Sequence, residues 1–360
     1  MADDFKYHID HHSALIAPAA LVRARGAAAE GRIGAEELRA VEDRSIEDAL
    51  HAQRRLGLAA VGDGQFRRRN ALSPYYDRVI GFGPQDSDAT HTAAAELVGP
   101  HLAPEHRPLT AKPEASGRLV QDEASFLAGA LDRPKLISLP SPGYVAELGG
   151  DASEADAAEL AKIVHDEIEA LAREEIAYVQ LHNPLAGVLL TKAGRERAGV
   201  LGLDADAALA RMRAADEAAI ADLKVPEEFR VGLDLVTAAA PALERGYDRD
   251  AVQAFLNGLT FTRLCVEYPE DAAARFPLDL LAPGTVVSLG VVDVADPELE
   301  DVDSLVARID EAATVIDIDD IAISTNGPFT AASATLDEAR QRAKLQLVEM
   351  TARYFWGNEL

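Results

Sequence analysis

The sequence is poor in cysteine, in positive charge and in long apolar stretches, and each shortage excludes a class of protein. Cys265 is the single cysteine, which excludes an intrachain disulfide framework and any metal site built on a C-x-x-C pair. Lys and Arg number 35 against 61 Asp and Glu, and the resulting net charge of −26 repels nucleic acid phosphates and anionic lipid surfaces. No apolar stretch reaches the roughly 18 residues needed to cross a bilayer. Because the start MADDFKYHID also lacks the basic and apolar regions of a signal peptide, we expect a cytoplasmic protein that binds neither nucleic acid nor membrane.

The chain does contain a regular alternation of β-branched runs with helical stretches. Eight runs end at polar or ionisable residues, and they span residues 6–12, 58–64, 135–140, 176–182, 230–237, 262–268, 285–293 and 320–326. Eight strands separated by helices are typical of an α/β fold, the TIM (β/α)8 barrel, which builds its active site at the C-terminal ends of the strands. A chain of 360 residues with 48% hydrophobic content fits one such domain over residues 1–360.

Residues 65–134, between the second and third runs, are too many for a plain connecting loop. The segment is rich in Pro, Gly, His and Asp, as in SPYYDRVIGFGPQDSDATHT. Long connections in compact domains are commonly lids or binding loops. We therefore expect an insertion near the mouth of the barrel.

An ordered set of short motifs runs along the whole chain. It begins with D-H-H-S at residues 10–13, G-R-I-G-A-E-E-L at 31–38 and V-G-D-G-Q-F-R-R at 61–68. Pro-Ser-Pro at 140–142, the Q-x-x-x-P frame at 180–184 and Val-Glu-Tyr at 266–268 follow in order. The set resembles the single-barrel relatives of the catalytic domain of cobalamin-independent methionine synthase. The resemblance implies a TIM barrel and, in the family, zinc-dependent methyl transfer to a thiol.

The zinc site that the resemblance implies is degenerate in this chain. The family holds its zinc with a His, a Cys, a Glu and a second Cys, and at those positions stand Asp234, Val236, Glu267 and Asn326. Without thiolates the site no longer favours zinc, and its oxygen donors suit Mg²⁺ or Mn²⁺ better. We expect no tightly bound zinc and no methylation of homocysteine. A hard divalent metal at Asp234 and Glu267 stays open.

Further departures fall where the resemblance implies contacts with substrate. The family's Q-I-D-E-P, whose acids resemble a pair that binds the substrate amine, is Q-L-H-N-P here, and its D-G-E is D-G-Q. An arginine at the barrel mouth could grip an anionic group of the substrate. The candidate substrate-binding residues are His11, Asp63, Gln65, Arg67, Gln180, Asn183 and Asn326.

His182, Asp234 and Glu267 are the ionisable groups that the strand ends should bring together, and they are our candidate catalytic residues. Without a metal, two carboxylates that face one cavity repel each other, so one of them has a raised pKa and can act as general acid or base. The alternative is a structural network in which Asp234 pairs with an arginine or with His182.

Two classes of function stay open. The first is an enzyme that acts on a small polar metabolite, by methyl or alkyl transfer or by a diverged acid–base or lyase reaction. The second is a catalytically silent paralogue that binds a metabolite or supports a partner enzyme. Ionisable groups replace part of the zinc site, which favours the enzyme. The sequence does not identify the substrate, and it leaves a homo-oligomer open.

Overall fold

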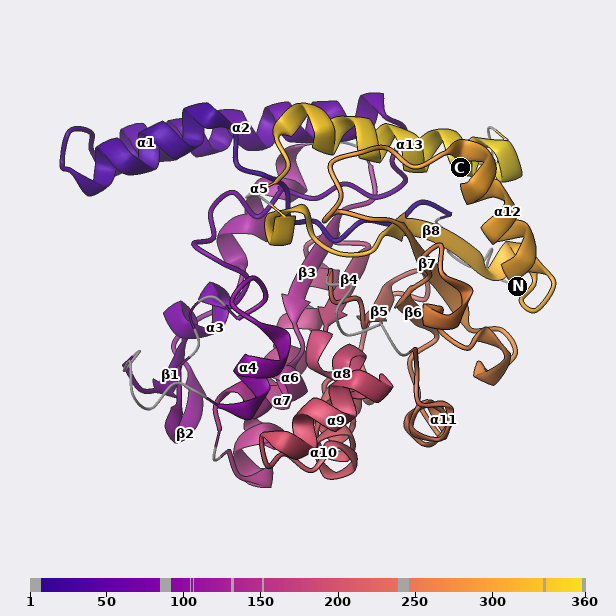
Figure 1. Ribbon diagram of the computed structural model, residues 1–360. Helices are drawn as coiled ribbons and strands as arrows, with labels where there is room; N and C mark the ends of the chain where they lie inside the picture. The colour runs from indigo at the N-terminus through magenta and orange to yellow at the C-terminus, as the bar shows by residue number, and fades with distance from the viewer. Residues whose placement is uncertain are drawn as a thin grey trace.

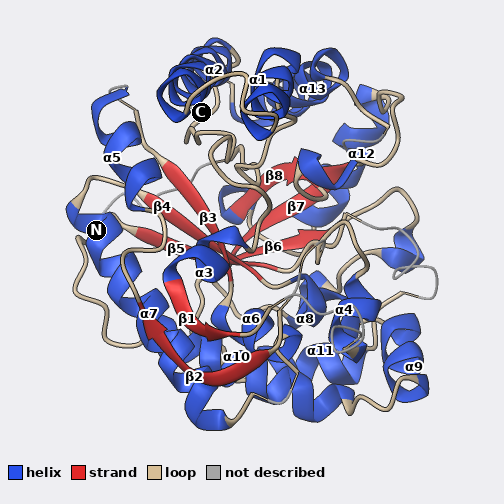
Figure 2. Cartoon of the chain, turned by 90° about the vertical axis from the view of Figure 1, so that its left-hand side faces the viewer, coloured by secondary structure: helices blue, strands red, loops and turns tan. Residues whose placement is uncertain are grey.

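The computed structural model of the chain describes residues 8–84, 92–103, 105, 107–130, 133–150, 152–238, 246–332 and 335–357. Residues 6 and 7 of the first predicted run, and parts of the predicted insertion, lie outside the described residues. At the centre is a parallel sheet of six strands in the order β3-β4-β5-β6-β7-β8 (Figure 2). These strands are β3 Leu136–Pro140, β4 Tyr178–His182, β5 Arg230–Asp234, β6 Arg263–Glu267, β7 Val286–Val292 and β8 Ile321–Thr325. The last six predicted runs are therefore confirmed as strands.

The first two predicted strands are each reduced to one bridge at an edge of the sheet. Ile9 bridges to Ile323 of β8, and Val61 bridges to Lys135 just before β3. A side chain joins these two segments: His11 Nε2 donates a hydrogen bond to the carbonyl oxygen of Ala60 at 3.0 Å. The extended conformation then ends at Gly64 and Gln65, whose φ angles are +73° and +58°.

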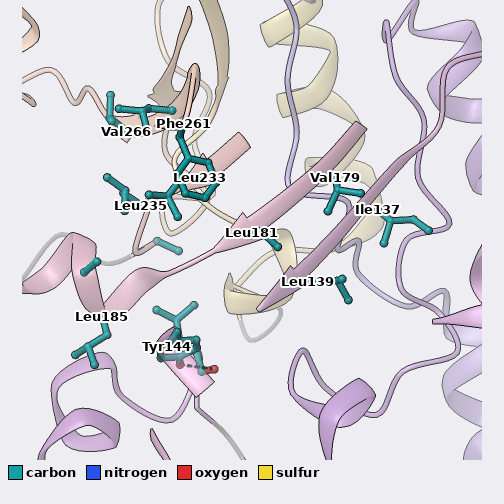
Figure 3. Packing of buried hydrophobic residues seen from close by; sticks show 14 of the residues in the cluster. Ile137, Leu139, Tyr144, Val179, Leu181, Leu185, Leu233, Leu235, Phe261 and Val266 are labelled. Carbon is teal, nitrogen blue, oxygen red and sulfur yellow. Dashed lines mark hydrogen bonds between the residues drawn. The ribbon is translucent and has the colours of Figure 1, made fainter. Parts of the chain in front are cut away.

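The strands are apolar on one face and polar on the other. Ile137 and Leu139 of β3 and Val179 and Leu181 of β4 belong to the main hydrophobic core, and Figure 3 shows how they pack. Successive side chains of a strand point to opposite faces, so Ser138 and the other alternate residues face away from that core. The strands thus present their ionisable groups on a single buried surface.

Helices cover the apolar face (Figures 1 and 2). They begin where sequence signals place them: Ser153 and Asp156, for example, form the reciprocal capping box that starts α7. The helices between and after the strands of the sheet are α6 Pro142–Leu148, α7 Glu154–Arg173, α8 Pro184–Leu189, α9 Lys192–Val200, α10 Ala205–Ile220, α11 Arg249–Leu256, α12 Val302–Ala313 and α13 Glu338–Trp356. Short 3₁₀ turns are η2 Ala272–Ala274, η3 Leu278–Leu280, η4 Ile318–Asp320 and η5 Phe329–Ala332.

Two further groups of elements precede β3. Helices α1 Ala19–Ala29 and α2 Ala35–Arg55 lie with α13 on one side of the molecule (Figures 1 and 2). Segment 65–134 contains α3 Ser73–Arg78, α4 Ala93–Val98 and α5 Gln121–Ala130, together with an antiparallel pair of strands, β1 Val79–Phe82 and β2 Leu109–Ala115. Within the described part of the chain, the helices are too short or too polar to cross a bilayer.

Candidate functional site

A cavity of about 890 Å³ lies at the C-terminal ends of the strands. The strand ends contribute His12, Ser138, Pro140 and His182 to its wall. Segment 65–134 contributes Gln65, Arg68, Arg69, His101 and Glu105, and helix α1 contributes Val22 and Arg25. A concave site of this size, with few polar groups that converge on it, suits a small metabolite.

His12 and Asp234 form a buried ion pair beneath this cavity. His12 Nδ1 donates to Asp234 Oδ2 at 2.7 Å, and Nε2 donates to the carbonyl oxygen of Thr325 at 2.8 Å. Because both partners accept, the imidazole must carry both protons. Burial would lower the pKa of His12, but the Asp234 carboxylate and the hydrogen bonds outweigh it and raise the pKa to about 9. Burial likewise opposes ionisation of Asp234, yet the charge of His12 lowers its pKa. Asp234 is therefore an ionised carboxylate whose charge is balanced by His12.

His182 is the neutral imidazole on the cavity wall. It ends β4 directly beside Asp234, its register partner on β5, and its Nε2 donates to the carbonyl oxygen of Val236 at 3.0 Å. Among the described residues no hydrogen bond engages Nδ1, which keeps its lone pair. Burial lowers the pKa of His182 below its ordinary 6.5. At neutral pH the ring can therefore accept a proton from a molecule in the cavity.

Glu267, at the end of β6, is buried next to the same strand ends. Its Oε1 accepts hydrogen bonds from the amide and the hydroxyl of Thr237, at 2.8 and 3.0 Å. Its Oε2 has no hydrogen-bond partner in the part of the chain that the structure describes. Burial raises the pKa of Glu267 to about 7. His182, Asp234 and Glu267 thus lie at neighbouring strand ends, and of the three only His182 lines the cavity.

Asp63 belongs to a second buried acid–base cluster. Arg68 holds Glu123 of α5 in a bidentate ion pair, at 2.8 and 2.6 Å, and donates to the carbonyl oxygen of Ser138. Burial, together with the charge of Glu123, raises the pKa of Asp63 to about 7. Gln65, two residues further on, lies on the cavity wall.

Two predicted substrate contacts lie within the polar interior of the sheet. Gln180 is fully buried and donates to Asp10, which also pairs with Arg263 at 2.8 Å. His11 is buried between the two edges of the sheet, where its Nδ1 accepts from the amide of Ser13. Neither residue is among those that line the cavity.

Three more candidates are engaged elsewhere. Arg67 stacks on Phe126 and pairs with Asp43. Asn183 caps α8 and donates to the buried Asp216 at 2.8 Å. Asn326 bonds the amide of Val294 and the carboxylate of Asp293, so it shapes the turn after β7. Their polar atoms serve the fold in this structure.

His12 and Arg25 are the residues that sequence reasoning missed. A signal for His12 exists: it alternates with Asp10 and so shares its face of the strand. Arg25 carries no such signal, because its position depends on how α1 meets the cavity.

The residues that the resemblance places at the zinc positions do not fit a zinc ion. Asp234 is bound to His12, Val236 offers no donor side chain, and Asn326 is bonded within its turn. Among the described residues, no three His, Cys, Asp or Glu side chains come together as a metal-binding group.

Comparison with known proteins bears on the whole chain. No family model matches it. The uncharacterized proteins YxjH and YxjG of Bacillus subtilis strain 168 are 27% and 25% identical to it, over 97% of this chain and 95% of each relative.

Two solved structures resemble the fold. A Listeria monocytogenes protein assigned as a vitamin-B12-independent methionine synthase matches with a TM-score of 0.75 and 20% identity over 98% of both chains. A B12-independent methionine synthase from Shewanella sp. W3-18-1, in complex with selenomethionine, matches with a TM-score of 0.71 and 18% identity over 90% of both chains. This chain therefore has the α/β fold of methionine-synthase-like proteins.

Proposed function

We propose that this protein is an enzyme of the cobalamin-independent methionine synthase family that transfers a methyl or alkyl group to a small polar metabolite without zinc–thiolate chemistry. His182 carries the proposal, because a neutral imidazole with a free Nδ1 lies on the wall of a metabolite-sized cavity. A proton acceptor at this position can take the proton of an attacking thiol, amine or hydroxyl group. The bond to Val236 holds the ring in one tautomer while it does so.

In this proposal the two carboxylates act through other residues. Asp234 keeps His12 charged and in place, and Glu267 holds Thr237 at the end of β5. The cytoplasm is the proposed location. We also propose that the segments at Ile9 and Val61 close the sheet into an eight-stranded barrel in one domain. Two contacts across the edges support closure, from Leu15 N to Gly64 O and from His11 Nε2 to Ala60 O, at 3.1 and 3.0 Å.

The test compares His182→Asn with His51→Asn, a matched change at an exposed histidine of α2. Wild-type protein is incubated with methyl donors and a panel of thiol and amine acceptors, and alkylated products are quantified by mass spectrometry. Loss of a positioned base typically costs 10² to 10⁴ in rate, so we expect roughly that loss for His182→Asn, an unchanged rate for His51→Asn and similar melting temperatures. Equal turnover in His182→Asn would contradict the proposal. A wild-type protein that binds acceptors but alkylates none would favour the silent paralogue.

A further inference from the structure

The charges on the cavity wall are opposite in sign to the net charge of the molecule. Within the described residues, His12, Arg25, Arg68 and Arg69 line the cavity as cations, and Glu105 lines it as an acid. The chain as a whole carries −26. Cations therefore outnumber acids among the side chains that line this cavity.

Most of these charges already have a partner. Arg68 pairs with Glu123 at 2.6 Å, Arg69 with Asp77 at 2.9 Å, and His12 with Asp234. Glu105 is likewise paired, with Arg107 at 3.2 Å. These groups bring little uncompensated charge to a ligand.

Arg25 is the exception on this wall. Its Nη2 donates to the carbonyl oxygens of Phe66 and Arg68, and no ion pair with a described carboxylate is formed. Glu42 acts on it from beyond ion-pair distance. Its Nε and Nη1 atoms have no hydrogen-bond partner among the described residues, and the two carbonyls hold the guanidinium half-buried at the rim. The held guanidinium keeps its positive charge, and Nε and Nη1 can each donate a single charge-assisted hydrogen bond to a carboxylate oxygen.

We infer that Arg25 anchors the carboxylate of an acidic metabolite in this cavity and so selects the substrate class of the enzyme. This inference rests on the proposed function for the reaction, but the anchor itself does not depend on turnover. Gln65 and His182 on the wall are neutral, and the acid Glu105 is paired with Arg107.

Malonate, its neutral counterpart malonamide and inorganic phosphate serve as probes, titrated calorimetrically at constant ionic strength. Charge-assisted hydrogen bonds contribute enough that their loss weakens binding roughly tenfold or more. We expect malonate to bind wild type and Arg23→Gln alike, since Arg23 is an exposed arginine on the same helix. Arg25→Gln should weaken malonate binding at least about tenfold, and Arg25→Lys should weaken it less. Circular dichroism and melting temperature verify that each variant folds.

Three outcomes overturn the inference: equal malonate affinity in wild type and Arg25→Gln, absence of malonate binding to wild type, or malonamide binding as tight as malonate binding. Phosphate bound more tightly than malonate through Arg25 contradicts the carboxylate assignment. His182→Asn should leave malonate affinity unchanged. Loss of turnover without loss of anion binding therefore tests the proposed function separately from the anchor.

Discussion

Asp234 shows how one partner changes the role of a residue. The sequence predicts a strand-end carboxylate free for catalysis, whereas the structure pairs it with His12 at 2.7 Å and leaves its side chain 1% exposed. Removing one member of a buried pair typically costs about 3 kcal/mol or more, because the other charge stays buried. We therefore expect Asp234→Asn to lower the free energy of unfolding by about that amount, and the exposed Asp303→Asn to change it by less than about 0.5 kcal/mol. Urea titration measures both. Equal stability of the two variants would show that the pair contributes little.

The same pair predicts a pH dependence above neutrality. His12 has a pKa of about 9 in the folded chain against an ordinary value of 6.5. Its contribution to stability is therefore complete below pH 6.5 and is lost as the pH rises through 9. We expect the melting temperature of wild type to fall across this window, and His12→Gln to fall less steeply. Parallel curves for the two proteins would contradict the raised pKa.

At the scale of elements, helix α8 packs unusually close to the strand end that carries Asp234. A Cβ atom added to Gly187 of α8 would lie 2.0 Å from the carbonyl oxygen of Leu235, whereas one added to Gly199 of α9 would meet nothing within 4 Å. Gly187→Ala should therefore cost about 1–3 kcal/mol of stability. Gly199→Ala, at an exposed helix position, should gain about 0.5–1 kcal/mol. Thermal melts compare the two, and a Gly187→Ala as stable as wild type would mean that α8 moves freely away from the strand.

The sequence predicted the strands that pair with their neighbours through a ladder of backbone hydrogen bonds. It did not predict where a side chain joins two segments. Strands β3 to β8 follow from β-branched runs, and their order brings His182, Asp234 and Glu267 together. The described residues of the first two runs form one β-bridge each, at Ile9 and Val61, and the imidazole of His11 makes a hydrogen bond between the two runs. The alternation of apolar and polar residues along the sequence does not reveal this contact of His11.

The contacts of site residues depended on long-range geometry that no local pattern records. His12 meets Asp234 across 222 positions of the chain, and Arg25 reaches the cavity from a helix outside the sheet. Arg67 and Arg68 are neighbours in sequence, yet only Arg68 lines the cavity. The local turn and the ion pair with Glu123 place the side chain of Arg68 at the cavity.

At the scale of the whole molecule, two buried acids should contribute most to stability on the acidic side of neutrality. Burial raises the pKa values of Asp63 and Glu267 to about 7, from ordinary values of 3.8 and 4.5. Through these two groups the folded chain binds more protons than the unfolded chain between these limits, so their contribution to stability falls as the pH rises from about 4 to about 7. The double variant Asp63→Asn and Glu267→Gln should remove this contribution and change how the melting temperature varies over this range. Parallel melting-temperature curves for wild type and the double variant would contradict the prediction.

In our proposal this α/β protein, which has the fold of methionine-synthase-like proteins, works through side chains where the family that it resembles uses a zinc–thiolate site. Asp234, Val236 and Asn326 supply no thiolate, Asp234 is paired with His12, and Oε1 of Glu267 accepts from Thr237. The most direct measurement is the zinc content of protein purified without added metal and dialysed against a chelator, determined by elemental analysis. We predict zinc far below one ion per chain. Zinc near one ion per chain that survives the chelator would contradict it.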